Sequence, residues 1–366
     1  MKILVAKLSD IGDVLTATPA LRALRQSLPT AKIDVLLPPK SAPVLEGSPY
    51  VDEIISFDKF VFDSPLGISS PASLVNVWRL IRGLRRRQYD AVLILHHLTT
   101  RWGAIKYAFL SHACGAPKRL GLNNGRGWFF TSSAADTGFG GRHEVEHWLE
   151  VAALLGARSD DRRMELALSP EDEAFASAHL TASDAPLAAI HPGAGAYSPA
   201  KRWSPEGFSQ VARALMQEGA RIVLVGGPQE RELAHRVLQG LDGPVVDLTG
   251  RTTIKQLAAV LRKCRLYIGN DSGVTHVAAA VGTPVVAVFG PSNHLAWGPW
   301  AGEQMVTVVR VDLPCSPCLY VSHKLGRRSG CPEMTCLKSV SPEMVLAAAR
   351  RLLGQWEHLR RTTNIR

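Results

Sequence analysis

Residues 266–276 read Leu266-Tyr267-Ile268-Gly269-Asn270-Asp271-Ser272-Gly273-Val274-Thr275-His276. The first three residues favour a buried strand and residues 274–280 favour a helix, so a short turn joins the two. Such a turn offers unpaired backbone N–H groups and the positive end of the helix dipole to an anion. Because Gly273 lets the backbone approach closely, and Ser272 and Thr275 add hydroxyl donors, a diphosphate fits here. Asp271 or Ser272 could instead simply cap the helix.

The same alternation of β-branched runs and helical stretches covers the chain twice. Strands are predicted at 3–6, 33–37, 53–57 and 91–95, and again at 187–191, 222–225, 245–247, 266–268 and 285–288. Helices are predicted between them, at 14–26, 74–86, 102–111, 145–155, 205–217, 230–238, 254–262 and 274–280. Alternating strands and helices imply parallel sheets with right-handed crossovers. We therefore expect an α/β protein with two doubly wound, Rossmann-like domains that face a cleft.

The length of 366 residues suits two such domains. A Pro-containing stretch at 169–186 indicates the boundary, so we expect an N-terminal domain at 1–175 and a C-terminal domain at 176–366. A Ser-Pro-Glu helix start at 341–343 indicates a terminal helix, which we expect to pack back across the boundary. Residues 58–71 are rich in Gly, Pro and Ser and favour a loop near an acceptor.

Two further strand-to-helix turns occur in the second half. His191-Pro192-Gly193-Ala194-Gly195 leads on to Lys201-Arg202-Trp203, and glycines with a Lys and an Arg at the carboxyl end of a strand favour an anion loop. The two cations could instead be an exposed charge pair at a helix entry. The third turn is Gly226-Gly227-Pro228-Gln229-Glu230, where Glu230 could accept hydrogen bonds from the two hydroxyls of a ribose. An ordinary negative charge at a helix N-terminus is an equally good interpretation of Glu230.

In the first half, the turn after the first predicted strand reads Lys7-Leu8-Ser9-Asp10-Ile11-Gly12-Asp13-Val14. Gly12 allows a tight turn, and Asp13 lies near the start of the following helix. A glycosyl acceptor hydroxyl needs a general base, and a carboxylate within hydrogen-bond reach is a common choice. Helix capping is the alternative role for these aspartates.

Composition excludes some classes of protein. Hydrophobic content is 46% and charged content is 20%, as in an ordinary globular protein, and the apolar runs fall short of the ~20 residues of a membrane span. The N-terminal apolar run is too short for a signal peptide, so we expect a cytoplasmic protein. The net charge of +10 comes from short clusters without a nucleic-acid motif. We expect a basic face toward a membrane-bound anionic acceptor, with peripheral contact at the inner face of the membrane. Scattered solvated charge is the alternative.

Four of the six cysteines cluster near the C-terminus, namely Cys315, Cys318, Cys331 and Cys336. Four thiolates in one span could hold a structural zinc or iron ion, and in a cytosolic protein that explanation outranks disulfides. The second pair is spaced by four residues rather than two, so free or partly oxidised thiols remain an alternative.

The ordered motifs resemble those of the heptosyltransferase family of glycosyltransferases. The resemblance rests on Lys7, Gly12-Asp13-Val14-Leu15 and Pro19-Ala20-Leu21, then on His191-Pro192-Gly193, Lys201-Arg202-Trp203, Gly226-Gly227, Asp271-Ser272-Gly273, Thr275-His276, Gly282-Thr283-Pro284 and Phe289-Gly290-Pro291-Ser292. It spans most of the chain and implies a GT-B fold, an ADP-heptose donor and inverting transfer to the inner core of lipopolysaccharide.

The resemblance also implies residue roles. Asp13 would be the catalytic base and Lys201 would neutralise the donor diphosphate. Donor-binding candidates are Gly12, Gly193, Lys201, Arg202, Glu230, Asp271, Ser272, Gly273, Val274, Thr275 and His276. Acceptor candidates for a phosphate or carboxylate contact are Arg101, Lys118 and Arg119.

No acidic metal-binding pair accompanies the phosphate turns, so we expect catalysis without a metal or other cofactor. A non-catalytic nucleotide-sugar binding module would keep the phosphate turns without needing Asp13. A nucleotide-sugar epimerase of the same fold, or a transferase for another sugar, nucleotide or acceptor, is a further alternative. A Rossmann dehydrogenase is disfavoured because Gly-x-Gly-x-x-Gly is missing after the first strand.

Overall fold

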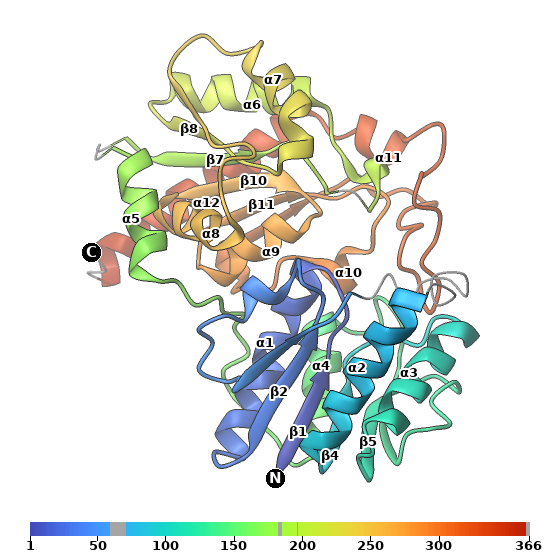
Figure 1. Ribbon diagram of the computed structural model, residues 1–366. Helices are drawn as coiled ribbons and strands as arrows, with labels where there is room; N and C mark the ends of the chain where they lie inside the picture. Colours follow the sequence, from blue (N-terminus) through green and yellow to red (C-terminus); the bar gives the residue numbers. More distant parts are fainter. Residues whose placement is uncertain (59–70, 182–184, 196, 364–366) are drawn as a thin grey trace. The chain divides into compact units, whose positions relative to one another are not determined.

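The computed structural model describes residues 1–58, 71–181, 185–195 and 197–363 (Figure 1). The chain divides into two compact units, Met1–Arg162 and Arg163–Arg366. Most of the predicted acceptor loop at 58–71 lies outside the described residues. Among the helices of the described ranges, none is both long enough and apolar enough to cross a membrane.

The N-terminal unit contains a parallel sheet of six strands in the order β3-β2-β1-β4-β5-β6. The strands are β1 (Lys2–Ala6), β2 (Lys32–Leu37), β3 (Glu53–Ser56), β4 (Ala91–Ile94), β5 (Lys118–Asn123) and β6 (Ser132–Ala135). The α-helices of this unit are α1 (Ile11–Ser27), α2 (Pro71–Arg87), α3 (Arg101–Ala113) and α4 (Glu144–Ala153), with a 3-10 helix η1 (Ala42–Val44).

The C-terminal unit contains a second parallel sheet of six strands in the order β12-β11-β10-β7-β8-β9. The strands are β7 (Leu187–His191), β8 (Arg221–Leu224), β9 (Val245–Asp247), β10 (Leu266–Asn270), β11 (Val285–Val288) and β12 (Val306–Val309). The α-helices are α5 (Pro170–His179), α6 (Pro205–Gln217), α7 (Arg231–Leu238), α8 (Ile254–Lys263), α9 (Gly273–Ala280), α10 (His294–Trp297), α11 (Thr335–Lys338) and α12 (Pro342–Thr363). Three 3-10 helices, η4 (Pro199–Lys201), η5 (Pro228–Glu230) and η6 (Glu303–Met305), complete the unit.

Both sheets have the strand order 3-2-1-4-5-6 of a doubly wound fold when each is numbered from its own first strand. The order reverses between β1 and β4 in the first sheet and between β7 and β10 in the second. Ligands of such sheets bind outside the carboxyl ends of the strands at this switch point. The topology therefore predicts ligand sites at the turns after β1 and β4, and at the turns after β7 and β10.

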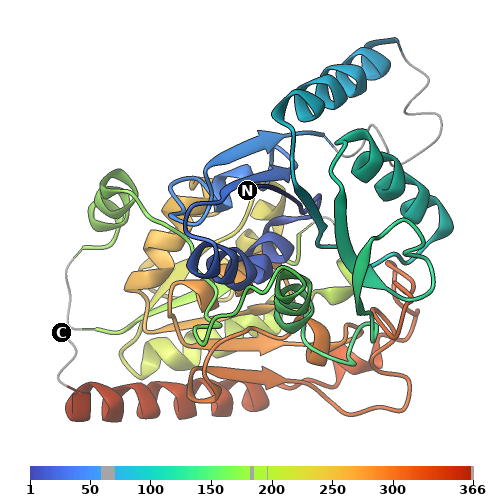
Figure 2. The same cartoon turned by 90° about the horizontal axis from the view of Figure 1, so that it is seen from below.

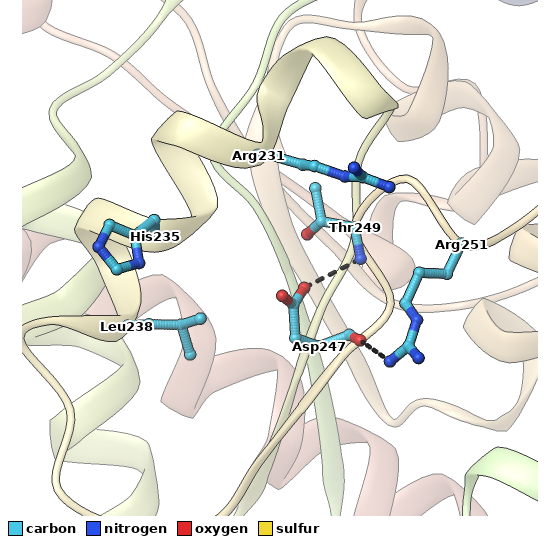
Figure 3. Close-up of a pocket in the computed structure, with 6 residues that line it drawn as sticks. All are labelled: Arg231, His235, Leu238, Asp247, Thr249 and Arg251. Atoms are coloured by element: carbon cyan, nitrogen blue, oxygen red, sulfur yellow. Dashed lines mark hydrogen bonds between the residues drawn. The ribbon is translucent and has the colours of Figure 1, made fainter.

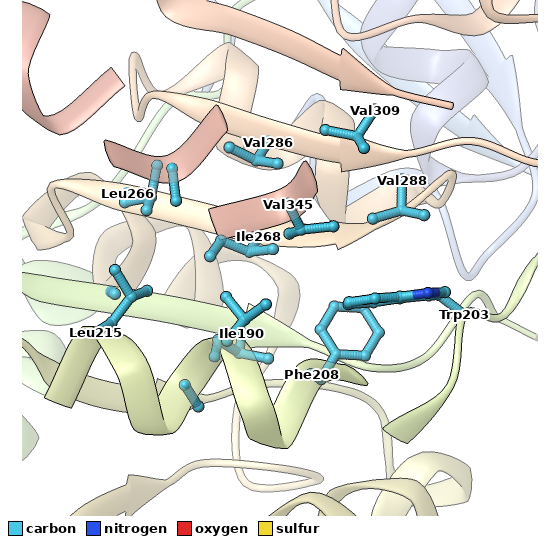
Figure 4. Close-up of a cluster of buried hydrophobic side chains, with 14 of the residues drawn as sticks. Ile190, Trp203, Phe208, Leu215, Leu266, Ile268, Val286, Val288, Val309 and Val345 are labelled. Atoms are coloured by element: carbon cyan, nitrogen blue, oxygen red, sulfur yellow. The ribbon is translucent and has the colours of Figure 1, made fainter. Parts of the chain in front are cut away.

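Strands β10 and β11 at the centre of the second sheet are fully buried, whereas β9 and most of β12 are only partly buried. Ile190, Leu266, Ile268, Val286 and Val288 form the sheet side of one cluster (Figure 4). Helix α6 covers it with Phe208 and Leu215, and α12 adds Val345 and Leu352. Helix α12, drawn in red in Figure 2, packs on β10, β11, β12 and α6, which fixes its first turns to the C-terminal unit. That it also packs across the boundary stays a prediction.

The predicted α/β class with two doubly wound sheets is confirmed. Three strands were missed, namely β5, β6 and β12. The first begins with two cations and contains a glycine, and the second reads Ser-Ser-Ala-Ala, so neither carries the usual β-branched signal. The units divide after Arg162, earlier than the predicted residue 175, because the acidic helix α5 packs on α8 of the C-terminal unit.

Candidate functional site

The turns after β7 and β10 are held together by one buried side chain, that of Asn270. Its amide nitrogen donates to the carbonyl oxygens of Pro192 and Gly193 at 2.9 and 3.0 Å. Its amide oxygen accepts from the backbone N–H of Trp203 at 2.9 Å. The end of β10 therefore fixes both the loop after β7 and the segment that carries Lys201.

A second set of hydrogen bonds joins the loop after β8 to the same place. The Glu230 carboxylate accepts from His191 Nε2 at 2.9 Å, from the Gly227 N–H at 2.8 Å and from the Gly195 N–H at 3.0 Å. Burial would raise the pKa of Glu230, but the bonds from His191 and the two backbone N–H groups outweigh it and lower that pKa to about 2. Glu230 is thus an ionised clamp between loops. Its Oε1 accepts one of these three bonds and its Oε2 accepts two.

Gly193 is required at this clamp by space rather than by backbone angle. A Cβ atom at Gly193 would lie 1.8 Å from Glu230 Oε1. The predicted anion loop is therefore glycine-containing because the carboxylate occupies the volume that a side chain would need.

Lys201 and Asp271, both predicted donor-site residues, form a buried ion pair with Nζ 3.0 Å from Oδ2. The Lys201 ammonium also lies 5.9 Å from the ring centroid of Tyr320. Tyr320 in turn stacks near Tyr197, at 5.9 Å between centroids. A buried ammonium with a single carboxylate and aromatic neighbours retains donors for a further anion.

Helix α9 starts directly beside this pair. Ser272 is its N-cap and accepts from the Thr275 N–H at 3.4 Å, so the capping alternative is realised for Ser272. Gly273 and Val274 begin the helix, and N–H groups of a first turn point outward toward an anion. Thr275 and His276 are buried in the first turn, and Arg202 is half-buried with its guanidinium on the Gly195 carbonyl at 3.0 Å.

A separate cavity of about 400 Å³ lies between α7 and the segment after β9 (Figure 3). It is lined by Arg231, His235, Leu238, Asp247, Thr249 and Arg251. The Asp247 carboxylate accepts a hydrogen bond from the Thr249 N–H at 2.9 Å. None of the predicted site residues lines this cavity, so we do not assign the donor to it.

In the N-terminal unit, Asp13 lies half-buried in the first turn of α1. The Asp13 carbonyl accepts from Thr16 Oγ1 at 2.8 Å, and Thr16 Oγ1 accepts from Trp148 Nε1 at 3.0 Å. Gly12 is buried beside it, whereas Asp10 is the exposed N-cap and makes no side-chain capping bond. The first turn of α1, and with it Asp13, is therefore anchored to α4.

A buried charge network lies at the same carboxyl edge of the first sheet. His97, which follows β4, contacts Asp136 Oδ1 through Nδ1 at 2.9 Å and Glu144 Oε1 through Nε2 at 3.1 Å. Burial would lower the pKa of His97, but the Glu144 and Asp136 carboxylates raise it to about 9. The Lys7 ammonium lies 3.8 Å from the centroid of the Trp148 ring in the same region. Two cations, His97 and Lys7, thus balance the carboxylates of Asp136 and Glu144.

The three predicted acceptor cations are not brought together. Arg101 is exposed at the start of α3, on the carboxyl side of β4. Lys118 and Arg119 begin β5, so they lie at the amino edge of a parallel sheet. Arg119 donates to the carbonyls of Phe129 at 2.9 Å and Ala116 at 3.3 Å, so its guanidinium is hydrogen-bonded to nearby backbone. Only Arg101 lies at the edge that the topology favours for ligands.

The four clustered cysteines are free thiols, of which Cys336 is buried. Burial and the neighbouring thiols Cys331 and Cys315 raise the pKa of Cys318, so these groups lie near one another. Within the part of the chain that the structure describes, the set with three metal-ligand atoms inside 4.8 Å is His97, Asp136 and His147, not the cysteines. The segment 315–336, which carries the four cysteines, contacts the surroundings of Lys201. Its Tyr320 ring lies near the Lys201 ammonium, and its Arg328 carbonyl accepts from Ser198 Oγ at 2.6 Å.

Comparison with known proteins gives a consistent result. Residues 77–327 match the model of glycosyltransferase family 9 (heptosyltransferase). Lipopolysaccharide heptosyltransferase 3 of Escherichia coli K12 is 30% identical over 352 residues, covering 94% of this chain and 96% of the relative.

Two solved structures extend the comparison. The Escherichia coli ADP-heptose lipopolysaccharide heptosyltransferase II superposes with a TM-score of 0.74 at 24% identity, covering 98% of this chain and 100% of that one. The iron-containing dodecameric glycosyltransferase TibC of enterotoxigenic Escherichia coli superposes with a TM-score of 0.57 at 16% identity, covering 96% of this chain and 75% of that one. These likenesses show the GT-B fold.

We predict that Gly193→Ala releases the clamp. The new Cβ displaces the Glu230 carboxylate from His191 and two backbone N–H groups. Loss of these charge-assisted bonds should cost at least about 2 kcal/mol of unfolding free energy. Affinity for a nucleoside diphosphate, measured by calorimetry, should fall at least tenfold. The matched control is Gly302→Ala, where a Cβ meets no atom within 4 Å. Equal behaviour of the two variants would contradict the clamp.

We predict that His97 makes the stability of the N-terminal unit pH-dependent. A folded-state pKa of about 9, against the ordinary histidine pKa of 6.5, means that the folded protein binds the extra proton. This stabilisation is complete below pH 6.5 and is lost as the pH rises through about 9. His97→Gln should abolish that slope in urea unfolding and cost about 3 kcal/mol at neutral pH. The exposed His179→Gln variant should keep the wild-type profile, and a wild-type profile in His97→Gln would refute the network.

Proposed function

Because this chain belongs to glycosyltransferase family 9, the heptosyltransferases, we propose that it transfers a heptosyl group with inversion from ADP-heptose to the lipopolysaccharide inner core or a related acceptor. The observation that carries the proposal is the buried Lys201–Asp271 pair beside the first turn of α9, at the switch point of the second sheet. The relatives named for heptosyl transfer supply the sugar and the acceptor class.

The donor diphosphate would bind where Lys201, the N-terminus of α9 and the loop of Gly193 meet. Lys201 and the first-turn N–H groups supply positive potential that grows in effect as the leaving diphosphate gains charge. Glu230 would take ribose hydroxyls through Oε1 while its other bonds hold the loops. Because Asp271 already offsets part of the Lys201 charge, the site would bind the nucleoside diphosphate and still release it after transfer.

The acceptor hydroxyl would be activated by Asp13. Its carboxylate takes the hydroxyl proton as that oxygen attacks the anomeric carbon, and the bond from the anomeric carbon to the diphosphate oxygen breaks. The electron pair leaves on the nucleoside diphosphate, so a single displacement inverts the anomeric centre. The Thr16–Trp148 hydrogen bonds keep the first turn of α1 in place during this step.

A glycolipid acceptor would be anionic and membrane-bound, so peripheral contact with the inner face of the membrane belongs to the proposal. Arg101 is the candidate for an acceptor phosphate or carboxylate.

The proposal assigns no metal to the reaction. A zinc or iron ion held by Cys315, Cys318, Cys331 and Cys336 would be structural, because their segment carries Tyr320, which lies beside Lys201. TibC is described as iron-containing, which makes the metal content of this chain worth measuring.

Asp13→Asn should retain donor binding and lose transfer, because the amide keeps the size of the side chain but cannot accept the proton. A decrease of roughly 100-fold or more in turnover is expected for a general base, with unchanged ADP affinity by calorimetry. Asp10→Asn is the matched control, since the exposed Asp10 makes no capping bond. Near-normal turnover in a folded Asp13→Asn protein would reject the role of Asp13.

Transfer should persist at its full initial rate in excess EDTA without added Mg²⁺ or Mn²⁺. Initial rates and a thermal melt should be measured on the same sample, with metal content before and after chelation. Slow loss of activity together with a lowered melting temperature would indicate a structural metal. Immediate loss with an unchanged melt, reversed by Mg²⁺, would refute metal-free transfer.

A further inference from the structure

Two neighbouring helices of the N-terminal unit expose large apolar side chains to solvent. Helices α2 and α3 pack side by side (Figures 1 and 2). Trp78 is 56% exposed and Ile105 is 51% exposed. Among the residues of the two helices whose burial is described, the exposed large apolar side chains are Leu74, Val75, Trp78, Trp102, Ile105 and Phe109. We call the outward faces of α2 and α3 the α2–α3 surface.

These apolar residues are additional to those that hold the helices in place. Val77 and Leu84 of α2 and Ala104 and Tyr107 of α3 are buried in the core of the unit. The exposed residues recur at helical spacing, at 74 and 78 and at 102, 105 and 109, so each helix has a second apolar stripe. Apolar side chains gathered in this way on a surface mark an interaction site.

The two helices themselves carry charge of one sign. Helices α2 and α3 contain seven Lys and Arg residues and no carboxylate. Arg87 forms ion pairs with Asp34, at 3.1 Å, and with Glu53. The exposed cations of α2 are Arg79, Arg82, Arg85 and Arg86. Arg82 lies over the Trp78 ring with Cζ 5.0 Å from its centroid.

We propose that the α2–α3 surface docks on a bilayer of anionic phospholipid. Arginines would bind the lipid phosphates, while Trp78 and its apolar neighbours enter the boundary between headgroups and acyl chains. This deepens the proposed function, on which it rests for the membrane-bound acceptor.

Charge decides against the other occupants. A second copy of the chain meeting this surface symmetrically would bring the arginines of α2 against one another. A nucleic acid would satisfy the arginines but leave Leu74, Val75 and Ile105 in water. An anionic bilayer satisfies both sets of side chains.

The test is cosedimentation of the full chain with vesicles of phosphatidylethanolamine and phosphatidylglycerol, and with vesicles of phosphatidylcholine alone. Wild-type protein should bind the anionic vesicles and not the neutral ones. Each basic residue near an anionic surface contributes roughly fivefold and each new Glu adds repulsion, so the triple variant Arg82→Glu, Arg85→Glu, Arg86→Glu should lose at least about 100-fold in affinity. Trp78→Ser should also weaken binding. A control variant with three charge reversals, at the exposed residues Arg158, Arg213 and Lys263, should keep most of the affinity for anionic vesicles.

Calorimetry with ADP and transfer to a water-soluble, delipidated acceptor separate this proposal from the proposed function. Unchanged donor affinity and soluble transfer, with lost vesicle binding in the α2 variants, support the surface. Equal vesicle binding by the α2 and control variants overturns it. A second result would also overturn the proposal: wild-type protein that binds no vesicles, is a dimer, and becomes a monomer on the Trp78→Ser substitution. If wild-type protein binds vesicles through α2 but transfers no heptose, the proposed function fails while the surface stands.

Discussion

The buried carboxamide of Asn270 sets the geometry on which the candidate donor site depends. It satisfies two carbonyls of the turn after β7 and one N–H of the segment after η4, so three stretches of chain meet at the end of β10. Each of these backbone groups would otherwise need another partner inside a buried region, where an unpaired group costs about 1–3 kcal/mol. The position of Lys201 beside Asp271 follows from this arrangement, as does the approach of Gly193 to Glu230.

The two units stabilise their switch-point turns by different chemistry. In the C-terminal unit the turns are joined by neutral hydrogen bonds around Asn270 and by the ionised Glu230 clamp. In the N-terminal unit the corresponding edge contains His97 between Asp136 and Glu144, with Lys7 against Trp148. A buried ionic set is expensive to desolvate unless each charge is paired, and pairing holds the surrounding elements in one arrangement. This suits an anchor for Asp13, while the hydrogen-bonded turns leave Lys201 available to an anion.

Local patterns predicted much of the fold. The bounds of β7, β9, β11 and α6 agree with the sequence-based ranges. Valine runs mark β9 and β11, and a Ser-Pro helix start marks α6. The three strand-to-helix turns of the second half were also predicted, since glycines and cations follow predicted strands, whereas phosphate binding by them stays a prediction. The partners of those turns could not be found. The sequence assigned no role to Asn270, and Tyr320 reaches Lys201 from more than a hundred residues away. Lys118 and Arg119 read as ligand cations because nothing local revealed the strand β5, whose register places them at the amino edge.

The chemistry that joins these features is inverting heptosyl transfer, and one product analysis tests it most directly. The purified chain would be incubated with ADP-heptose and a lipopolysaccharide core acceptor, and the product examined by mass spectrometry and by NMR of its anomeric proton. The account predicts an acceptor heavier by one heptosyl residue, ADP released in equal amount, and an anomeric configuration opposite to that of the donor. A product with retained configuration, or a folded protein that binds ADP-heptose and leaves the acceptor unchanged, would contradict it.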